Sequence, residues 1–223
     1  MKSSATLISG LTIAVLAVAL ILAGYGAALA VGGVGGKTVS TTTVTSNVTN
    51  SSSSAPFDIT LVIATNSTFN STQGAQPAYF VLGPHGLQSS AKIALPADRL
   101  IKLVIVNYDD GNATLNVPND NVVSGTTNGT IFVASNSNIN ASEGASGIVL
   151  NGGQTLSSVP VADIAHTFTV PSLNLNIPVP TSSTVVAYFT VSNSGTYTWF
   201  CETSCGDAPM STQGWMTGSL VAS

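Results

Sequence analysis

Four side chains in the last third of the sequence are of types that bind soft metal ions. Cys201 and Cys205 are the only cysteines, with three residues between them, and Met216 follows in the same stretch, "WFCETSCGDAPMSTQGWMTG". His166 lies upstream in "ADIAHTFTVP", among apolar residues and just before a proline. Thiolate, thioether and imidazole are ligands that suit copper. The pattern indicates a copper site formed by one strand residue and a loop over 201–216.

The same residues allow a plainer interpretation. Two cysteines can form a disulfide, which an oxidising compartment favours. His166 is then an interior histidine and Met216 a core residue. Glu202, beside the loop, is interpreted as solvated. At the level of the sequence, the disulfide and the metal site both remain open.

Charged residues are scarce in this chain, and their scarcity limits the classes of function that the chain could have. Only 5 Lys+Arg and 9 Asp+Glu occur, or 6% of residues, against about a quarter in a typical soluble domain. No basic stretch is present, which excludes a nucleic-acid partner. No catalytic triad, phosphate loop or zinc spacing is found. The sequence therefore offers no signature of these catalytic classes.

The beginning of the sequence predicts export. Residues 1–37 hold a long uncharged apolar run between Lys2 and Lys37, long enough for a transmembrane anchor, although a cleaved signal is the alternative. A Ser/Thr-rich linker follows over 38–56. We expect the remainder to lie outside the cytoplasm at the cell membrane, because Lys2 marks the inner side. Seven glycosylation sequences agree with an external, glycoprotein character: Asn47, Asn50, Asn66, Asn70, Asn112, Asn128 and Asn140.

From residue 57 to 223 the pattern is that of strands. Short β-branched or aromatic segments, such as "RLIKLVIVNYD" and "STVVAYFTVS", alternate with Gly, Asn, Ser and Pro, and no stretch has helical periodicity. This predicts one all-β sandwich or barrel. The region of about 118–160 is richer in Asn, Ser and Gly, and is interpreted as an insertion with a hairpin around "GTIFVAS".

Two segments resemble a known family. They look like the ligand segments of subunit II of haem-copper terminal oxidases, and they read "DIAHTFTVPSLNLNIPVP" and "GTYTWFCETSCG", the latter followed by "GWMTGSLV". Within that family the chain resembles an archaeal, quinol-oxidase-like member. The resemblance implies a cupredoxin-like Greek-key β-sandwich outside the membrane. That family carries a two-copper centre.

Position by position, the resemblance implies copper ligands in this chain. His166, Cys201, Cys205 and Met216 match family ligands, and Thr203 matches the residue whose backbone carbonyl caps one copper. Gln213 stands where a second histidine is expected. An amide oxygen is a poor ligand for a soft cuprous ion. The resemblance therefore implies a degenerate centre with one copper ion or none.

The resulting expectation is a membrane-anchored, extracytoplasmic, non-catalytic subunit of a cytochrome c or quinol oxidase in a respiratory chain. Its partners would be the catalytic haem-copper subunit and a quinol or small electron-carrier donor, and it would carry electrons through a single copper or be metal-free. One alternative is an independent mononuclear copper carrier. Another is a structural cell-surface or filament β-sandwich with a Cys201–Cys205 disulfide.

Overall fold

The computed structural model describes residues 55–66, 76–140, 149–150 and 152–223. The predicted anchor at 1–37, nearly all of the linker at 38–56, and Asn47, Asn50 and Asn70 lie outside these residues. In the part of the chain that is described, no helix is long and apolar enough to cross a bilayer.

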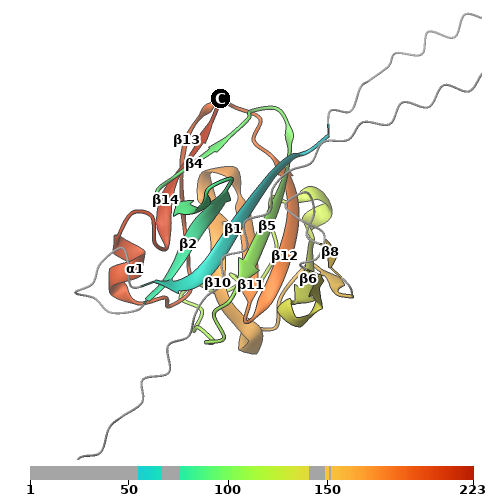
Figure 1. Ribbon diagram of the computed structural model, residues 1–223, viewed down its shortest axis with the longest axis vertical. Helices are drawn as coiled ribbons and strands as arrows, with labels where there is room; N and C mark the ends of the chain where they lie inside the picture. The colour runs from blue at the N-terminus through green and yellow to red at the C-terminus, as the bar shows by residue number, and fades with distance from the viewer. Residues whose placement is uncertain (1–54, 67–75, 141–148, 151) are drawn as a thin grey trace, which may run out of the picture. The chain divides into compact units, whose positions relative to one another are not determined.

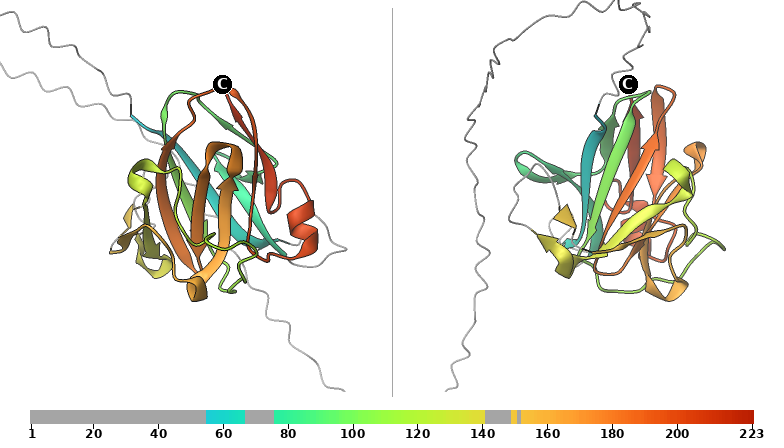
Figure 2. Two further views of the ribbon diagram at one scale, coloured as in Figure 1. Left: turned by 180° about the vertical axis from the view of Figure 1, so that it is seen from behind. Right: turned by 90° about the vertical axis from the view of Figure 1, so that its right-hand side faces the viewer.

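Two β-sheets make up the body of the domain, and the edge-on view in Figure 2 shows them as two layers. The larger sheet has seven strands in the order β3-β2-β1-β5-β12-β6-β9, and the smaller has five in the order β11-β10-β13-β14-β4. The strands are β1 Phe57–Asn66, β2 Gln76–Gly83, β3 Gly86–Ser89, β4 Lys92–Leu95, β5 Leu100–Asn107, β6 Ile131–Ser135, β7 Ile139–Asn140, β8 Val149–Leu150, β9 Gln154–Leu156, β10 Ile164–Val170, β11 Leu175–Pro180, β12 Ser183–Thr190, β13 Gly195–Phe200 and β14 Thr217–Ala222. The expected all-β sandwich is confirmed.

Few helical turns interrupt the strands. Four described 3₁₀ turns are η1 Thr127–Gly129, η2 Asn136–Asn138, η4 Val161–Asp163 and η5 Pro171–Leu173. A short helix, α1 Asp207–Ser211, lies in the loop between β13 and β14, and Figure 1 shows it beside β2. The sequence does not predict this helix, because five residues are too few to produce a periodic apolar face.

The core forms between the sheets because the central strands are apolar. β5 is flanked by β1 in parallel and by β12 in antiparallel register, and its second half is buried throughout. In the smaller sheet β14 lies between β13 and β4 and alternates between buried and half-buried positions, as expected for a strand with one face on the core. Neighbouring strands that are distant in sequence indicate Greek-key rather than meander connections.

The strand β11 contains two prolines and is not among the strands that the sequence predicts. Pro178 and Pro180 lack the N–H group that a ladder needs, so proline is tolerated mainly at sheet edges. β11 is the edge strand of the smaller sheet and pairs only with β10 among the described strands. Its edge position explains how a proline-containing strand is accommodated.

The predicted insertion contributes to the large sheet. β6, which contains the "IFVAS" of the expected hairpin, pairs with β12 on one side and with β9 on the other, both antiparallel. β7 and β8 form a separate two-stranded ladder. The hairpin partner of β6 is therefore β9.

Three adjacent strands of the smaller sheet bring the candidate ligands together. β10 carries His166 and is buried along its whole length, with a register shift against β11 between Ile164 and His166. β13 leads into Cys201, and β14 begins directly after Met216. Because β13 pairs with both β10 and β14, the histidine and the cysteine loop lie at the same end of the sandwich.

Gly218 of β14 allows close packing against β13 and tests this arrangement. A Cβ atom at Gly218 would lie 2.5 Å from Trp199 Nε1 and 2.7 Å from the Ser90 carbonyl oxygen. We expect Gly218→Ala to lower the free energy of unfolding by about 1–3 kcal/mol, the usual cost of overpacking, measured by chemical denaturation. Gly195→Ala is the matched control, since its Cβ would meet no atom closer than 3.5 Å. Equal losses in the two variants would contradict the packing.

Candidate metal centre

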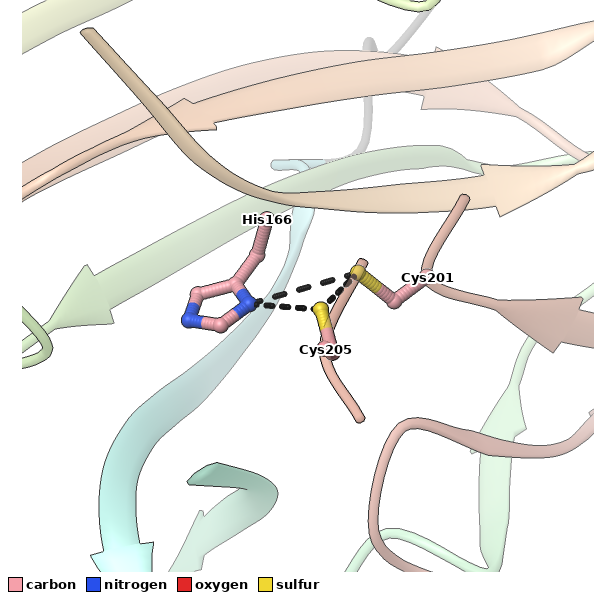
Figure 3. Close-up of side chains that lie close together, drawn as sticks. All are labelled: His166, Cys201 and Cys205. Carbon is pink, nitrogen blue, oxygen red and sulfur yellow. Dashed lines mark hydrogen bonds between the residues drawn. The ribbon is translucent and has the colours of Figure 1, made fainter. Parts of the chain in front are cut away.

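Three side chains predicted as ligands converge at one end of the sandwich. Figure 3 shows the ring of His166 facing the sulfur atoms of Cys201 and Cys205. His166 Nδ1 lies 3.1 Å from Cys205 Sγ and 4.0 Å from Cys201 Sγ, and the two Sγ atoms are 2.7 Å apart. All three residues are buried, and one ligand atom from each lies within 4.8 Å of the others. The arrangement is that of a small, water-excluded group of soft donors.

Both cysteines are free thiols in this structure. The distance between their sulfur atoms is longer than the roughly 2.05 Å of a disulfide bond. It is shorter than the distance expected between the sulfur atoms of two thiolates bound to one metal ion. At the metal–sulfur distance of about 2.3 Å in tetrahedral sites, the sulfur atoms would be about 3.8 Å apart. Binding an ion therefore requires the thiols to separate by about 1 Å.

His166 is held by a carboxylate that sequence reasoning did not identify. Its Nε2 atom lies 2.9 Å from Asp109 Oδ2. When Nε2–H donates to this carboxylate and Nδ1 is deprotonated, the Nδ1 lone pair faces the two sulfur atoms. A carboxylate behind the ligating imidazole is a frequent arrangement at metal sites, because it fixes the tautomer and the ring orientation.

Asp109 is itself fixed by its surroundings. Its N–H donates to Asn107 Oδ1, and its Oδ1 accepts the N–H of Gly111, both at 3.0 Å. Its carbonyl oxygen accepts the N–H of Ser182 at 2.9 Å. The sequence contains one indication of Asp109, because this residue lies in the polar segment "NYDDGN" at the end of an apolar strand. The strand pairing that brings this turn next to His166 could not be deduced from it.

Thr203 contacts both sulfur atoms through its side chain, and its carbonyl oxygen lies 4.0 Å from Cys201 Sγ. The hydroxyl oxygen lies 3.1 Å from Cys201 Sγ and 3.2 Å from Cys205 Sγ, and donates to the Ala165 carbonyl at 2.9 Å. The carbonyl oxygen of Thr203 accepts the N–H of Cys205 at 2.8 Å. Thr203 therefore connects the cysteine loop to β10, and a capping role for its carbonyl stays a prediction.

Met216 and Gln213 occupy different environments. Met216 is fully buried in the same core cluster as both cysteines, and its carbonyl accepts the N–H of Cys201 at 2.8 Å. Gln213 is exposed, one residue before a buried glycine. The structure thus brings Met216 into the surroundings of the thiols and leaves Gln213 on the surface, while a ligand role for either stays a prediction.

The three converging groups titrate together. Burial by itself lowers the pKa of His166, but the hydrogen bonds with Asp109 and Cys201 outweigh it and raise the pKa to about 9. Burial also opposes ionisation of Cys201, yet hydrogen bonds from Cys205 and His166 hold its pKa well below the usual value. The neighbouring Cys201 raises the pKa of Cys205. The pKa shifts of the three groups therefore act together: they favour ionisation of Cys201, and they keep the protons on His166 and on Cys205.

A pair of hydrogen-bonded carboxyl groups, Glu202 and Asp120, lies next to Cys201. Glu202 was expected to be solvated, but it is only half-exposed. Burial, with contributions from Asp120 and Cys201, raises its pKa to about 7. Asp120 is buried, and its Oδ2 atom has no hydrogen-bond partner. These residues are far apart along the chain, so their pairing could not be predicted from the sequence.

Aromatic rings pack behind the site. Tyr79 is fully buried and donates its hydroxyl to the Thr167 carbonyl at 3.0 Å. Its ring stands edge-on to Trp199 at 5.3 Å and to His166 at 6.4 Å between centroids. Trp199 is fully buried and stacks on Phe168. These rings exclude water from one side of the group of donors.

Comparisons with known proteins give distant likenesses. No protein-family model and no curated protein matches the sequence. Among solved structures, the chain is similar to the periplasmic domain of subunit II of cytochrome oxidase (CoxB) of Bradyrhizobium japonicum, with 9% identity over 75% of this chain and 83% of that chain and a TM-score of 0.34. Rusticyanin from Thiobacillus ferrooxidans is similar at 12% identity over 74% and 76%, with a TM-score of 0.32.

A third similar structure is the copper-containing nitrite reductase of Thermus scotoductus SA-01, at 12% identity over 75% of this chain and 30% of that chain, with a TM-score of 0.36. At such identities the likeness concerns the fold alone. What the site can bind follows from its own side chains. One imidazole and two thiols, buried together and mutually within 4.8 Å, are donors that fit one copper ion.

Replacing Asp109 tests the electrostatics of the site. In the metal-free protein we expect His166 to titrate near pH 9, and to titrate at a lower pH in Asp109→Asn, because the neutral amide no longer stabilises the imidazolium. NMR titration of the histidine ring signals measures both values. The adjacent, exposed Asp110 provides the control variant Asp110→Asn, which should leave the His166 pKa unchanged.

The same variant has a predicted pH profile of stability. The stabilisation from the raised pKa of His166 is complete below its ordinary value of 6.5 and is lost as the pH rises through about 9. We therefore expect Asp109→Asn to lower the free energy of unfolding by about 2 kcal/mol near pH 6, and by less above pH 9. A loss that grows with pH would contradict this coupling.

Proposed function

We propose that this chain is a copper-binding electron-transfer domain that holds one ion through His166, Cys201 and Cys205. The convergence of the three side chains carries the proposal. Its chemistry is specific, because thiolate and imidazole together favour copper over the hard ions that bind oxygen. The hydrogen bond from Nε2 to Asp109 leaves Nδ1 as the ring atom available to the ion.

The residues around the site are suited to this task. Copper, when bound, supplies one-electron transfer between its cuprous and cupric states. The chain holds His166 on a fully buried strand and fastens the cysteine loop through the Thr203 side chain. The aromatic rings behind His166 exclude water. A site fixed in this way changes little in geometry between oxidation states, which favours rapid electron transfer.

The number of histidines favours one ion rather than two. The chain contains two histidines in all, and His85 is an exposed residue in the turn between β2 and β3. A second ion would have to share the thiolates without an imidazole of its own. We therefore propose a mononuclear site.

We further propose that the domain belongs to a subunit II of a haem-copper terminal oxidase, anchored in the cell membrane on the extracytoplasmic side. The apolar segment at 1–37 and the matched ligand positions at 166 and 201–216 support this role. The catalytic haems would belong to a partner subunit, and a quinol or small electron carrier would be the donor. An independent copper carrier would have the same site without that partner.

Copper reconstitution tests the site itself. We expect the reduced, full-length chain to bind one copper per molecule and the oxidised form to give a four-line paramagnetic resonance spectrum. His166→Ala should abolish this signal, because Nδ1 is the only imidazole nitrogen at the site. His85→Ala is the matched control and should leave the spectrum unchanged.

Two outcomes would contradict a mononuclear copper site. A seven-line spectrum with two coppers per chain would indicate a two-copper centre. No copper uptake, together with no free thiol on titration of the protein as isolated, would mean that Cys201 and Cys205 form a disulfide in a structural domain.

Purification from native membranes tests the oxidase role separately. Co-purification with a multi-helix haem protein is expected for an oxidase subunit. Recovery of a copper-loaded chain without haem would favour the independent carrier.

Met216 is the candidate for a further ligand. Met216→Leu nearly conserves side-chain volume, and such changes usually cost less than about 1.5 kcal/mol of stability. If the thioether binds copper, the variant should still take up one ion but show altered visible absorption and hyperfine splitting. Spectra identical to those of the unmodified protein would make Met216 a packing residue only.

A further inference from the structure

The hydroxyl group of Thr203 lies against both sulfur atoms of the site without being one of its soft donors. Its oxygen is 3.1 Å from Cys201 Sγ and 3.2 Å from Cys205 Sγ, and the residue is completely buried. Hydrogen bonding around a cysteine sulfur influences the redox potential of a copper site. The direction of that influence depends on whether the hydroxyl turns its hydrogen or its lone pairs toward the sulfur atoms.

The hydrogen of this hydroxyl is already used by the main chain of β10. A threonine hydroxyl has one hydrogen to donate, and Thr203 donates it to the Ala165 carbonyl at 2.9 Å. Ala165 is the residue at which the register of β10 against β11 shifts, between Ile164 and His166. The extra residue of a bulge is left unpaired in the ladder, so its carbonyl oxygen needs a partner elsewhere. The Thr203 hydroxyl is that partner.

The main chain on either side keeps the hydroxyl in this place. The Thr203 carbonyl accepts the N–H of Cys205 at 2.8 Å, and an isolated antiparallel bridge joins Thr203 to Leu115. The hydroxyl could donate to a sulfur only by giving up the Ala165 carbonyl. That exchange would leave a buried acceptor without a partner, which is costly.

Toward the sulfur atoms, Thr203 therefore offers acceptor lone pairs. While the cysteines are thiols, an S–H group can donate to the hydroxyl oxygen. When both are thiolates, their negative sulfur atoms face the negative end of the hydroxyl dipole. The N–H of Thr167 donates to Cys201 Sγ at 3.4 Å, so this sulfur has a hydrogen-bond donor that does not depend on Thr203.

We propose that Thr203 lowers the reduction potential of the copper site, because its hydroxyl keeps its lone pairs toward the sulfur atoms and its hydrogen on the Ala165 carbonyl. A negative dipole end beside the thiolates favours the state with more positive charge, which is the cupric state. A hydroxyl that donated to the thiolates would have the opposite effect. Thr203 acts here through the two cysteines and not as a ligand. The inference rests on the proposed copper function.

Reduction potentials of copper-loaded variants test the direction of this effect. Thr203→Val replaces the hydroxyl by a methyl group, and we expect a higher potential, with the cuprous form favoured about threefold or more at a fixed solution potential. Thr203→Ser keeps a hydroxyl and should restore the potential of the unmodified protein. Thr212→Val is the matched control and should leave the potential unchanged, because the Thr212 hydroxyl donates to the Ala208 carbonyl of the same loop at 2.8 Å. Redox titration followed by visible absorption measures all four proteins.

The possible results separate this inference from the copper function itself. A lower potential in Thr203→Val would overturn the inference alone, because it would mean that the hydroxyl donates to the thiolates. An unchanged potential in that variant would also overturn it. Failure of the unmodified chain to take up copper would overturn the proposed function and this inference together.

NMR of the unmodified protein decides the matter if Thr203→Val does not fold or bind copper. The cuprous protein is diamagnetic, and burial slows exchange of the Thr203 hydroxyl proton with water. We expect scalar coupling between this proton and the isotope-labelled carbonyl carbon of Ala165, in the metal-free and in the cuprous protein. Loss of the coupling on copper binding would overturn the inference, since the hydroxyl would have turned toward a thiolate. Absence of the coupling in the metal-free protein would overturn it as well.

Discussion

The hydrogen bond between His166 and Asp109 is the interaction on which the geometry of the site depends. A buried imidazole has to satisfy both ring nitrogens. Asp109 accepts from one of them, which leaves the other directed at the sulfur atoms. Without this carboxylate, the imidazole ring could flip and direct a carbon atom, in place of Nδ1, at the sulfur atoms.

The segment that carries Asp109 also joins the two halves of the site. After β5 the chain runs past the beginning of β10, where the Ala113 N–H donates to the Ile164 carbonyl at 2.9 Å. It then contacts the cysteine loop, where the Ser204 N–H donates to the Thr114 carbonyl at 3.0 Å. One connecting segment therefore contacts both the histidine strand and the cysteine loop, so the positions of the three donors are coupled through main-chain bonds rather than only through side chains.

The sequence was most informative where a pattern depends on local neighbours. Alternation and β-branching predict strands over 99–109 and 183–192, and β5 and β12 occupy these segments, because adjacent residues on a pleated strand face opposite sides. The Cys-x-x-x-Cys spacing and the "AHTF" segment predict which residues could meet. What could not be predicted depends on contacts between distant segments: Asp109 behind His166, the Thr203 hydroxyl between the sulfurs, and Asp120 near Glu202. The β11 strand was missed for another reason, since its prolines argue against a strand unless its edge position is known.

Burial of the donor group has a consequence for its charge. The pKa shifts favour a protonated His166 beside an ionised Cys201, with the Asp109 carboxylate on the far side of the ring. A charged group in an apolar setting is costly unless it has a partner of opposite charge. Here the partners are His166 and Cys201, which are potential metal ligands, and Asp109, which holds His166 in place. A cation at the sulfur atoms would take the place of protons on these side chains without exposing any of them to water. The hydrogen bonds that stabilise the protonated side chains would therefore also orient their donor atoms toward a metal ion. This explains how the same buried group of side chains is compatible with the protonated and the metal-bound form.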